Sequence, residues 1–275
     1  MLVEDISKDM SRLVEAADWM HSEARSSAKL KADNLQFIIG YPMDLLNDTF
    51  LDAQYKQNNL AVDSFLHNMM VVHKQIEEET FRKYRSEFKG ADYTSVNAMV
   101  VEVNAYYVPN VLGLPLGILQ EPVFNSERPQ YMNYGGIGYV IGHESSHGFD
   151  ENGRLVNHNG TLEMWWDEDT LSSFQEKVRC MVEQYSNITN KDTNVTVNGV
   201  LTQSENIADN VGIKLAYRAY QRHVAAHGPE PRIPLRFPDG SSLELSPNQM
   251  FWVSFAYFQC AKLSPQELDR TMRTE

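Results

Sequence analysis

Apolar residues recur at helical spacing in two stretches near the start of the chain. Spacings of three and four residues place side chains on one face of a helix. The first stretch predicts a helix over 9–32, with a stripe formed by Leu13, Ala16, Ala17, Met20 and Ala24. The second predicts a helix over 60–88, with a stripe formed by Val62, Phe65, Leu66, Met69 and Ile76. Both stripes are typical of helices that pack on a core.

The pattern changes after Asp92. Residues 99–107 are rich in strand formers and stop at Pro109, so they predict a strand. Three more helices are predicted over 133–149, 169–186 and 203–227, and the last ends at Gly228, a usual C-cap position. Ser246 and Ser264 each precede a proline and, three residues on, a Gln or Glu, which predicts two more helix starts. We therefore expect a mainly α-helical fold with a small β-sheet.

Composition places the chain among ordinary globular proteins. Its 275 residues can bury a full core, and 42% are hydrophobic and 22% charged. No apolar run reaches the roughly 20 residues that span a bilayer, and the acidic N-terminus is unlike a signal peptide. The net charge of −13, with dispersed lysines and arginines, repels phosphate backbones. We therefore expect no nucleic-acid partner.

Cysteines and sequons say little about the compartment. Cys180 and Cys260 could form one disulfide or remain two thiols, and the sequence does not decide between these states. Such N-x-[ST] sequons arise often by chance, so they favour a secreted context only slightly. Four occur, at Asn47, Asn159, Asn187 and Asn194.

The most informative local motif is His-Glu-Ser-Ser-His at 143–147. On a helix, His143 and His147 lie one above the other and can ligate one metal ion. Glu144 lies about 100° round the helix, where it can contact a water without ligating the metal. The motif also occurs by chance on solvated helices, but the small and apolar residues 135–142 before it indicate a buried helix. The pattern predicts zinc with Glu144 as general base.

A catalytic zinc needs a third protein ligand and one open position. Glu205 offers that ligand from the helix predicted at 203–227, and Asp209 lies one turn further on. Asp209 can then hydrogen-bond a ligating histidine. Alone, this pair would be read as a solvated acidic face, but Ile207 and Ala208 between the two carboxylates favour partial burial.

Other catalytic constellations have less support. His223 and His227 repeat the spacing of the histidine pair without the glutamate, and they lie in a last helical turn where His is favoured. We interpret them as surface residues. Neither cysteine has local support as a nucleophile, and no GxSxG motif is present.

Four segments together resemble the neprilysin/endothelin-converting-enzyme family of zinc peptidases. They are VNAYY (103–107), LGILQEP (116–122), NYGGIGYVIGHESSHGFDENGR (133–154) and SENIADNVGIKLAYRAYQ (204–221). The resemblance implies a thermolysin-like (gluzincin) catalytic domain over 96–275 and, over 1–95, part of a helical outer domain with linking helices. It implies one Zn²⁺ held by His143, His147 and Glu205. It also implies that Glu144 is the general base and that Asp209 is a carboxylate that hydrogen-bonds a zinc ligand.

The resemblance also implies short peptide substrates. Asn104 and Ala105 match the pair that binds the substrate backbone from an edge strand. Val123 and Gln259 replace positions that are often aromatic in the family, which alters the expected preference for a large apolar residue after the cut. The residues that match the family's hydrophobic S1′ pocket are Ile118, Val123, Tyr139, Val140, Phe258 and Gln259.

Two departures from the family leave alternatives open. The chain ends at Thr274-Glu275, where the family continues into a TDxHSP…R motif, and it lacks the family's usual N-terminal membrane anchor. The family's partners for Cys180 and Cys260 also lie outside it. We expect an incomplete chain that is a poor and marginally stable peptidase, extracellular or at the cell surface. A catalytically impaired zinc- or peptide-binding paralogue is the alternative.

Overall fold

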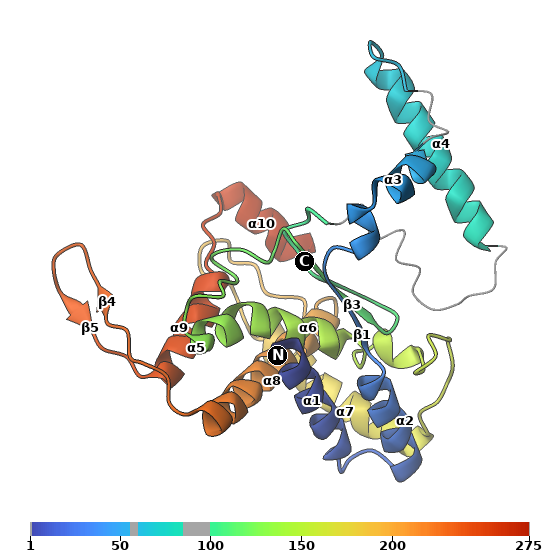
Figure 1. Cartoon of the computed structure of the whole chain (residues 1–275). Coiled ribbons are helices and arrows are strands. Elements are labelled where there is room, and N and C mark those ends of the chain that lie inside the picture. Colours follow the sequence, from blue (N-terminus) through green and yellow to red (C-terminus); the bar gives the residue numbers. More distant parts are fainter. Residues whose placement is uncertain (1, 56–59, 85–99, 275) are drawn as a thin grey trace.

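The computed structural model describes residues 2–55, 60–84 and 100–274. Helices dominate these residues, as Figure 1 shows. The α-helices are α1 (Leu2–Glu15), α2 (Ser22–Asp33), α3 (Asp48–Tyr55), α4 (Phe65–Tyr84), α5 (Gln130–Asn133), α6 (Tyr139–His147), α7 (Glu168–Ser186), α8 (Gln203–His227), α9 (Pro247–Phe258) and α10 (Pro265–Thr274). The strands are β1 (Gln36–Gly40), β2 (Tyr106–Val108), β3 (Val111–Pro115), β4 (Leu235–Arg236) and β5 (Ser242–Leu243).

The core forms where α1, α6, α8 and α9 meet around a π-helical segment, Tyr134–Gly138. Its centre includes Ile6, Leu215, Tyr220 and Phe251, each with 0% of its surface exposed. Helix α8 is the longest helix described and runs beside α6 (Figure 1). Both helices bury apolar side chains, among them Ile141 of α6 and Leu215 of α8, which stabilises their packing in the core.

A three-stranded sheet lies beside α6, with strand order β1-β3-β2. Strand β3 is central and completely buried, pairing in parallel with β1 and antiparallel with β2. Among the described strands, β2 is therefore an edge of this sheet. Strands β4 and β5 form a separate hairpin (Figure 1).

The expectation of a mainly helical fold with small sheets is confirmed. Helices α7 and α8 agree with their predicted ranges to within one residue. Ser246 forms a capping box with Gln249 at the start of α9, and Ser264 accepts a hydrogen bond from the backbone of Glu267 at the start of α10. The helix expected at 60–88 is present as α4, which begins at Phe65. The expectation that its apolar stripe packs on a core was wrong: α4 stands away from the core, and Phe65, Leu66 and Ile76 are 80%, 71% and 55% exposed (Figure 1).

Three expectations were wrong in detail. The single helix over 9–32 is two helices, because the chain turns so that Trp19 can pack on Trp166 and Phe174, at centroid distances of 6.0 and 6.3 Å. The helix over 133–149 begins earlier, at α5, and contains the π-helical segment. The break between α1 and α2 has no Gly or Pro to signal it, whereas the π-helical segment contains Gly135, Gly136 and Gly138, which weaken a regular α-helix.

The strand expected at 99–107 is also shorter than predicted. Only Tyr106 and Tyr107 of that range belong to β2, and Met99 lies outside the described residues. Val101 and Val103 are 80% and 71% exposed, so their β-branched side chains have no sheet to pack on. The proposed domain boundary at 95/96 also falls outside the described residues.

None of the helices that the structure describes is both long and apolar enough to cross a lipid bilayer.

Candidate metal centre

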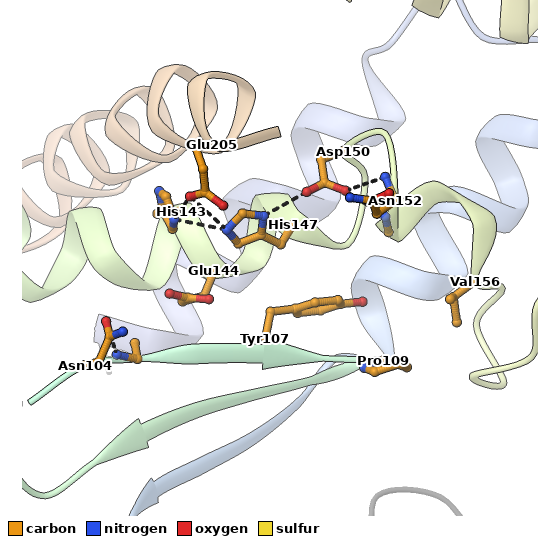
Figure 2. Close-up of a pocket in the computed structure, with 12 residues that line it drawn as sticks. Asn104, Tyr107, Pro109, His143, Glu144, His147, Asp150, Asn152, Val156 and Glu205 are labelled. Carbon is orange, nitrogen blue, oxygen red and sulfur yellow. Dashed lines mark hydrogen bonds and ion pairs between the residues drawn. The ribbon is translucent and has the colours of Figure 1, made fainter. Parts of the chain in front are cut away.

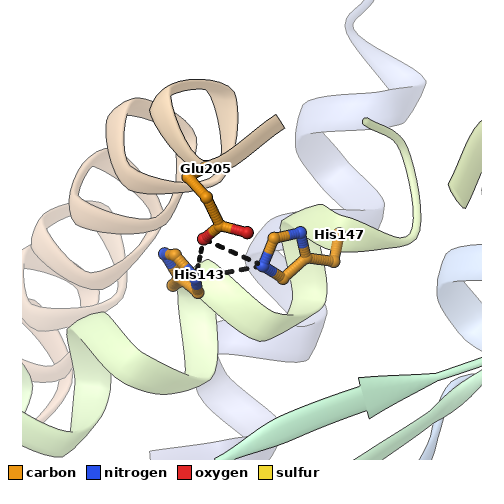
Figure 3. Close-up of side chains that lie close together, drawn as sticks. All are labelled: His143, His147 and Glu205. Atoms are coloured by element: carbon orange, nitrogen blue, oxygen red, sulfur yellow. Dashed lines mark hydrogen bonds and ion pairs between the residues drawn. The ribbon is translucent and has the colours of Figure 1, made fainter. Parts of the chain in front are cut away.

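Helix α6 presents His143 and His147 toward one point (Figure 3). Their Nε2 atoms lie 3.0 Å apart, as the spacing of four residues in a helix allows. Each imidazole is largely buried, with 16% and 17% of its side chain exposed. The two nitrogens can therefore bind one metal ion together, on the side of the imidazoles that stays accessible.

Helix α8 brings Glu205 to the same point from its first turn. Its Oε2 atom lies 3.3 Å from Nε2 of His143 and 3.7 Å from Nε2 of His147. A close helix crossing permits this approach: a Cβ added to Gly142 would lie 2.5 Å from the carbonyl oxygen of Gly212. The two glycines let α8 approach α6 immediately beside His143.

A carboxylate fixes each imidazole from behind. Oδ1 of Asp209 lies 2.8 Å from Nδ1 of His143, and Oδ2 of Asp150 lies 2.8 Å from Nδ1 of His147. An ionised carboxylate only accepts hydrogen bonds, so Nδ1 of each imidazole donates to it and Nε2 is the nitrogen left to bind a metal. With a metal bound, both histidines would be in the tautomer that it requires.

Asp150 is a residue that the sequence analysis did not identify. It is 3% exposed, and its second oxygen accepts hydrogen bonds from the backbone N–H groups of Asn152 and Gly153 at 2.9 and 2.7 Å. Its place three residues after His147 is a signal that could have pointed to it, because such residues share a helix face. The chain leaves the helix after His147, however, so the contact depends on the following turn.

The donor atoms fit a zinc ion. A tetrahedral zinc with bonds of about 2.0–2.1 Å separates its ligand atoms by about 3.3 Å. The separations here are 3.0, 3.3 and 3.7 Å. Among the described residues, a second group with possible ligand atoms contains His21, Asp167 and Asp169, but all three are exposed and Asp167 caps α7. The group on α6 and α8 is the better metal site.

The electrostatic surroundings favour a cation. Burial lowers the pKa of His143, but hydrogen bonds to Asp209 and Glu205 outweigh it and raise the pKa to about 10. The carboxylates therefore stabilise positive charge at this imidazole in the absence of a metal, and they would stabilise a metal cation in the same way. Burial also raises the pKa of Glu144, against the opposing effect of both histidines.

A cleft of about 560 Å³ opens beside these groups (Figure 2). Glu144, which is 7% exposed, lies between α6 and strand β2 without contributing to the three converging ligand atoms. Asn104 and Ala105 approach from the opposite wall, immediately before β2. The lining residues are Asn104, Ala105, Tyr107, Pro109, His143, Glu144, His147, Asp150, Asn152, Gly153, Val156 and Glu205.

None of the residues that match the family's S1′ pocket lines this cleft. Ile118, Val123 and Val140 are buried members of the hydrophobic core. The ring of Tyr139 lies 5.9 Å from that of Phe258, and its hydroxyl donates a hydrogen bond to Asp209. Gln259 is exposed at the end of α9.

The interpretation of His223 and His227 as surface residues is right for His227 and wrong for His223. His227 is exposed, but His223 is only 9% exposed, because Tyr134 packs against its ring at 5.6 Å. Neither belongs to a group of possible metal ligands in the described part of the chain. Cys180 and Cys260 are exposed free thiols rather than disulfide partners of each other.

Paired histidines on α6, a glutamate on α8 and a small sheet across a cleft define the class of thermolysin-like metallopeptidase folds. The chain belongs to peptidase family M13, whose family model matches residues 104–275.

Curated relatives cover the whole length of the chain. It is 37% identical to neprilysin-2 of Drosophila melanogaster, over 99% of this chain and 34% of that protein. It is 35% identical to human neprilysin, over 100% of this chain and 36% of that protein. The chain thus spans about a third of the length of these relatives.

Solved structures give the same result. The crystal structure of the Mycobacterium tuberculosis zinc metalloprotease ZMP1 in complex with an inhibitor superposes with a TM-score of 0.79 at 27% identity, covering 98% of this chain and 39% of that one.

Proposed function

We propose that this chain carries the zinc-binding and water-activating centre of a metalloendopeptidase that cleaves short peptides. The observation that carries the proposal is the convergence of His143, His147 and Glu205 beside a buried glutamate at the wall of a cleft. Membership of peptidase family M13 supports the reaction class. The chain's own activity, its substrates and its partners belong to the proposal.

His143, His147 and Glu205 would hold one zinc ion per chain. Bound zinc supplies Lewis acidity and lowers the pKa of a coordinated water to about 7. Glu144 acts as general base and takes a proton from the attacking water. Its buried position makes it a stronger base than an exposed glutamate, and it can pass the proton to the leaving amine.

An extended peptide would bind along the edge strand β2. Among the residues that the structure describes, β2 is paired on one side, with β3, and its other side can pair with a substrate strand. Asn104 and Ala105 precede that strand and face the cleft, so we assign them to the substrate backbone. A pocket for the side chain after the cut, formed by Ile118, Val123, Tyr139, Val140, Phe258 and Gln259, stays a prediction from the family.

Hydrolysis of short peptides tests this function. The zinc-loaded chain is incubated with a mixture of short unblocked peptides, and Glu144→Gln under the same conditions sets the background. We expect internal cleavages, identified by mass spectrometry, in the wild type only. Wild-type cleavage no higher than this background would contradict the peptidase proposal, and zinc and peptide binding without cleavage would favour the impaired paralogue.

Asp150→Asn is expected to weaken zinc binding by about 10–100-fold while the chain stays folded. An amide can still accept the backbone N–H groups through its oxygen, but its NH₂ group would face Nδ1 of His147. That contact favours the tautomer with the proton on Nε2, where it blocks a metal bond. Zinc affinity measured by chelator competition checks this, and an affinity equal to that of wild type would refute the role of Asp150.

The family relationship also leads us to propose an extracellular or cell-surface location. All four sequon asparagines, Asn47, Asn159, Asn187 and Asn194, are exposed, as glycosylation requires. A mobility shift on endoglycosidase treatment of secreted protein tests this, and no shift would remove the support that the sequons give.

A further inference from the structure

Tyr139 lies one helical turn before His143 and reaches the same carboxylate. Its hydroxyl donates a hydrogen bond to Oδ1 of Asp209, and that same oxygen lies 2.8 Å from Nδ1 of His143. One carboxylate oxygen therefore joins a tyrosine and a candidate zinc ligand. The sequence spacing of four residues explains why Tyr139 and His143 share a helix face, but not why both meet Asp209.

Tyr139 is enclosed by its neighbours, whereas Asp209 is partly exposed. Tyr139 is 4% exposed, and its ring packs on Phe255 and Phe258 of α9 at centroid distances of 4.8 and 5.9 Å. The side chain of Asp209 is 43% exposed and so has room for other rotamers. A hydrogen bond from an enclosed donor restricts the orientations of a partly exposed carboxylate.

We propose that Tyr139 is a positioning residue for the metal centre, fixing Asp209 so that Asp209 in turn orients His143. The inference rests on the proposed zinc function. It gives Tyr139 a role in metal binding besides the substrate pocket implied by the family, and it connects α9 to the zinc site through the aromatic contacts.

Tyr139→Phe tests the inference because it removes a single oxygen and keeps the ring in its packing. We expect zinc affinity, measured by competition with a chelator, to fall by about 10-fold, the lower end of the effect of removing a group behind a metal ligand. The matched control is Tyr134→Phe. Tyr134 is fully buried nearby, and its hydroxyl donates to Asp5 at 2.6 Å, away from the ligands.

Both variants lose one buried tyrosine–aspartate hydrogen bond, so both are expected to lower the melting temperature of the metal-free chain. Only Tyr139→Phe is expected to weaken zinc binding, which a purely structural role would not do. Equal zinc affinities for the two variants, with wild type binding zinc, would overturn the inference and leave the proposed function intact. A wild type that binds no zinc would overturn both.

A double-mutant cycle tests whether Tyr139 acts through Asp209. In an Asp209→Asn background, Tyr139→Phe is expected to change zinc affinity by less than about twofold, because the carboxylate that it positions is already gone. If the loss of zinc affinity in the double variant equalled the product of the losses in the two single variants, Tyr139 would act independently of Asp209. The inference would then be wrong.

Discussion

Glu144→Gln is expected to lower kcat for peptide hydrolysis by at least about 10²–10⁴-fold while zinc content stays that of wild type. The amide has the size and shape of the carboxylate but cannot take a proton from the attacking water. Glu144 does not belong to the converging ligand atoms, so the metal site should be unaffected. The other carboxylates of the cleft have other contacts, since Glu205 belongs to the ligand group and Asp150 is hydrogen-bonded to His147.

Glu151→Gln is the matched control for this change. Glu151 lies a few residues beyond the motif, pairs with Arg154 at 2.7 Å and does not line the cleft. We expect this variant to keep wild-type rate and zinc content. If Glu144→Gln retained as much activity as Glu151→Gln, the general-base role would be ruled out.

His143→Ala is expected to abolish stable zinc binding, with affinity lowered by more than about 100-fold. The change removes a ligand, and removing groups that only support ligands already weakens binding by about 10–100-fold. It also leaves Asp209 without the N–H group that it accepts. A ligand at a hundredfold excess over its Kd stabilises a fold by about 2.7 kcal/mol. Added zinc should therefore raise the melting temperature of wild type but not of this variant.

His227→Ala is the control for the loss of a histidine. His227 is exposed at the end of α8, where its Nδ1 lies 3.0 Å from the carbonyl oxygen of His223. We expect its zinc affinity and its zinc-dependent melting to match those of wild type. The same zinc-dependent rise in melting temperature in His143→Ala would show that the metal binds elsewhere.

The local part of the site could be predicted from sequence because helix geometry is local. A spacing of four residues fixes how His143 and His147 lie on any α-helix, whatever surrounds it. Glu205 could be named because a helix is predicted over 203–227 and because residues 204–221 resemble a segment of the family. What spacing did not predict is that Gly142 and Gly212 bring the two helices into close contact.

Tertiary contacts account for the rest. Strand β1 pairs in parallel with β3, so that Gln36 lies beside Val111 although the two residues are far apart in the sequence. No local sequence pattern indicates such a partner. Asp150 holds His147 only because the chain turns directly after α6. Tyr139 shares a face with His143 by spacing, but its acceptor Asp209 comes from a different helix.

X-ray absorption spectroscopy at the zinc edge tests the central claim most directly. The wild-type chain, loaded with one equivalent of zinc, is expected to show two imidazole nitrogens and carboxylate or water oxygens at about 2.0–2.2 Å, with no sulfur. This is the coordination that His143, His147 and Glu205 provide, with one position left for water. Sulfur at about 2.3 Å, which only Cys180, Cys260 or a methionine could supply, or a spectrum without paired imidazoles, would contradict the assignment.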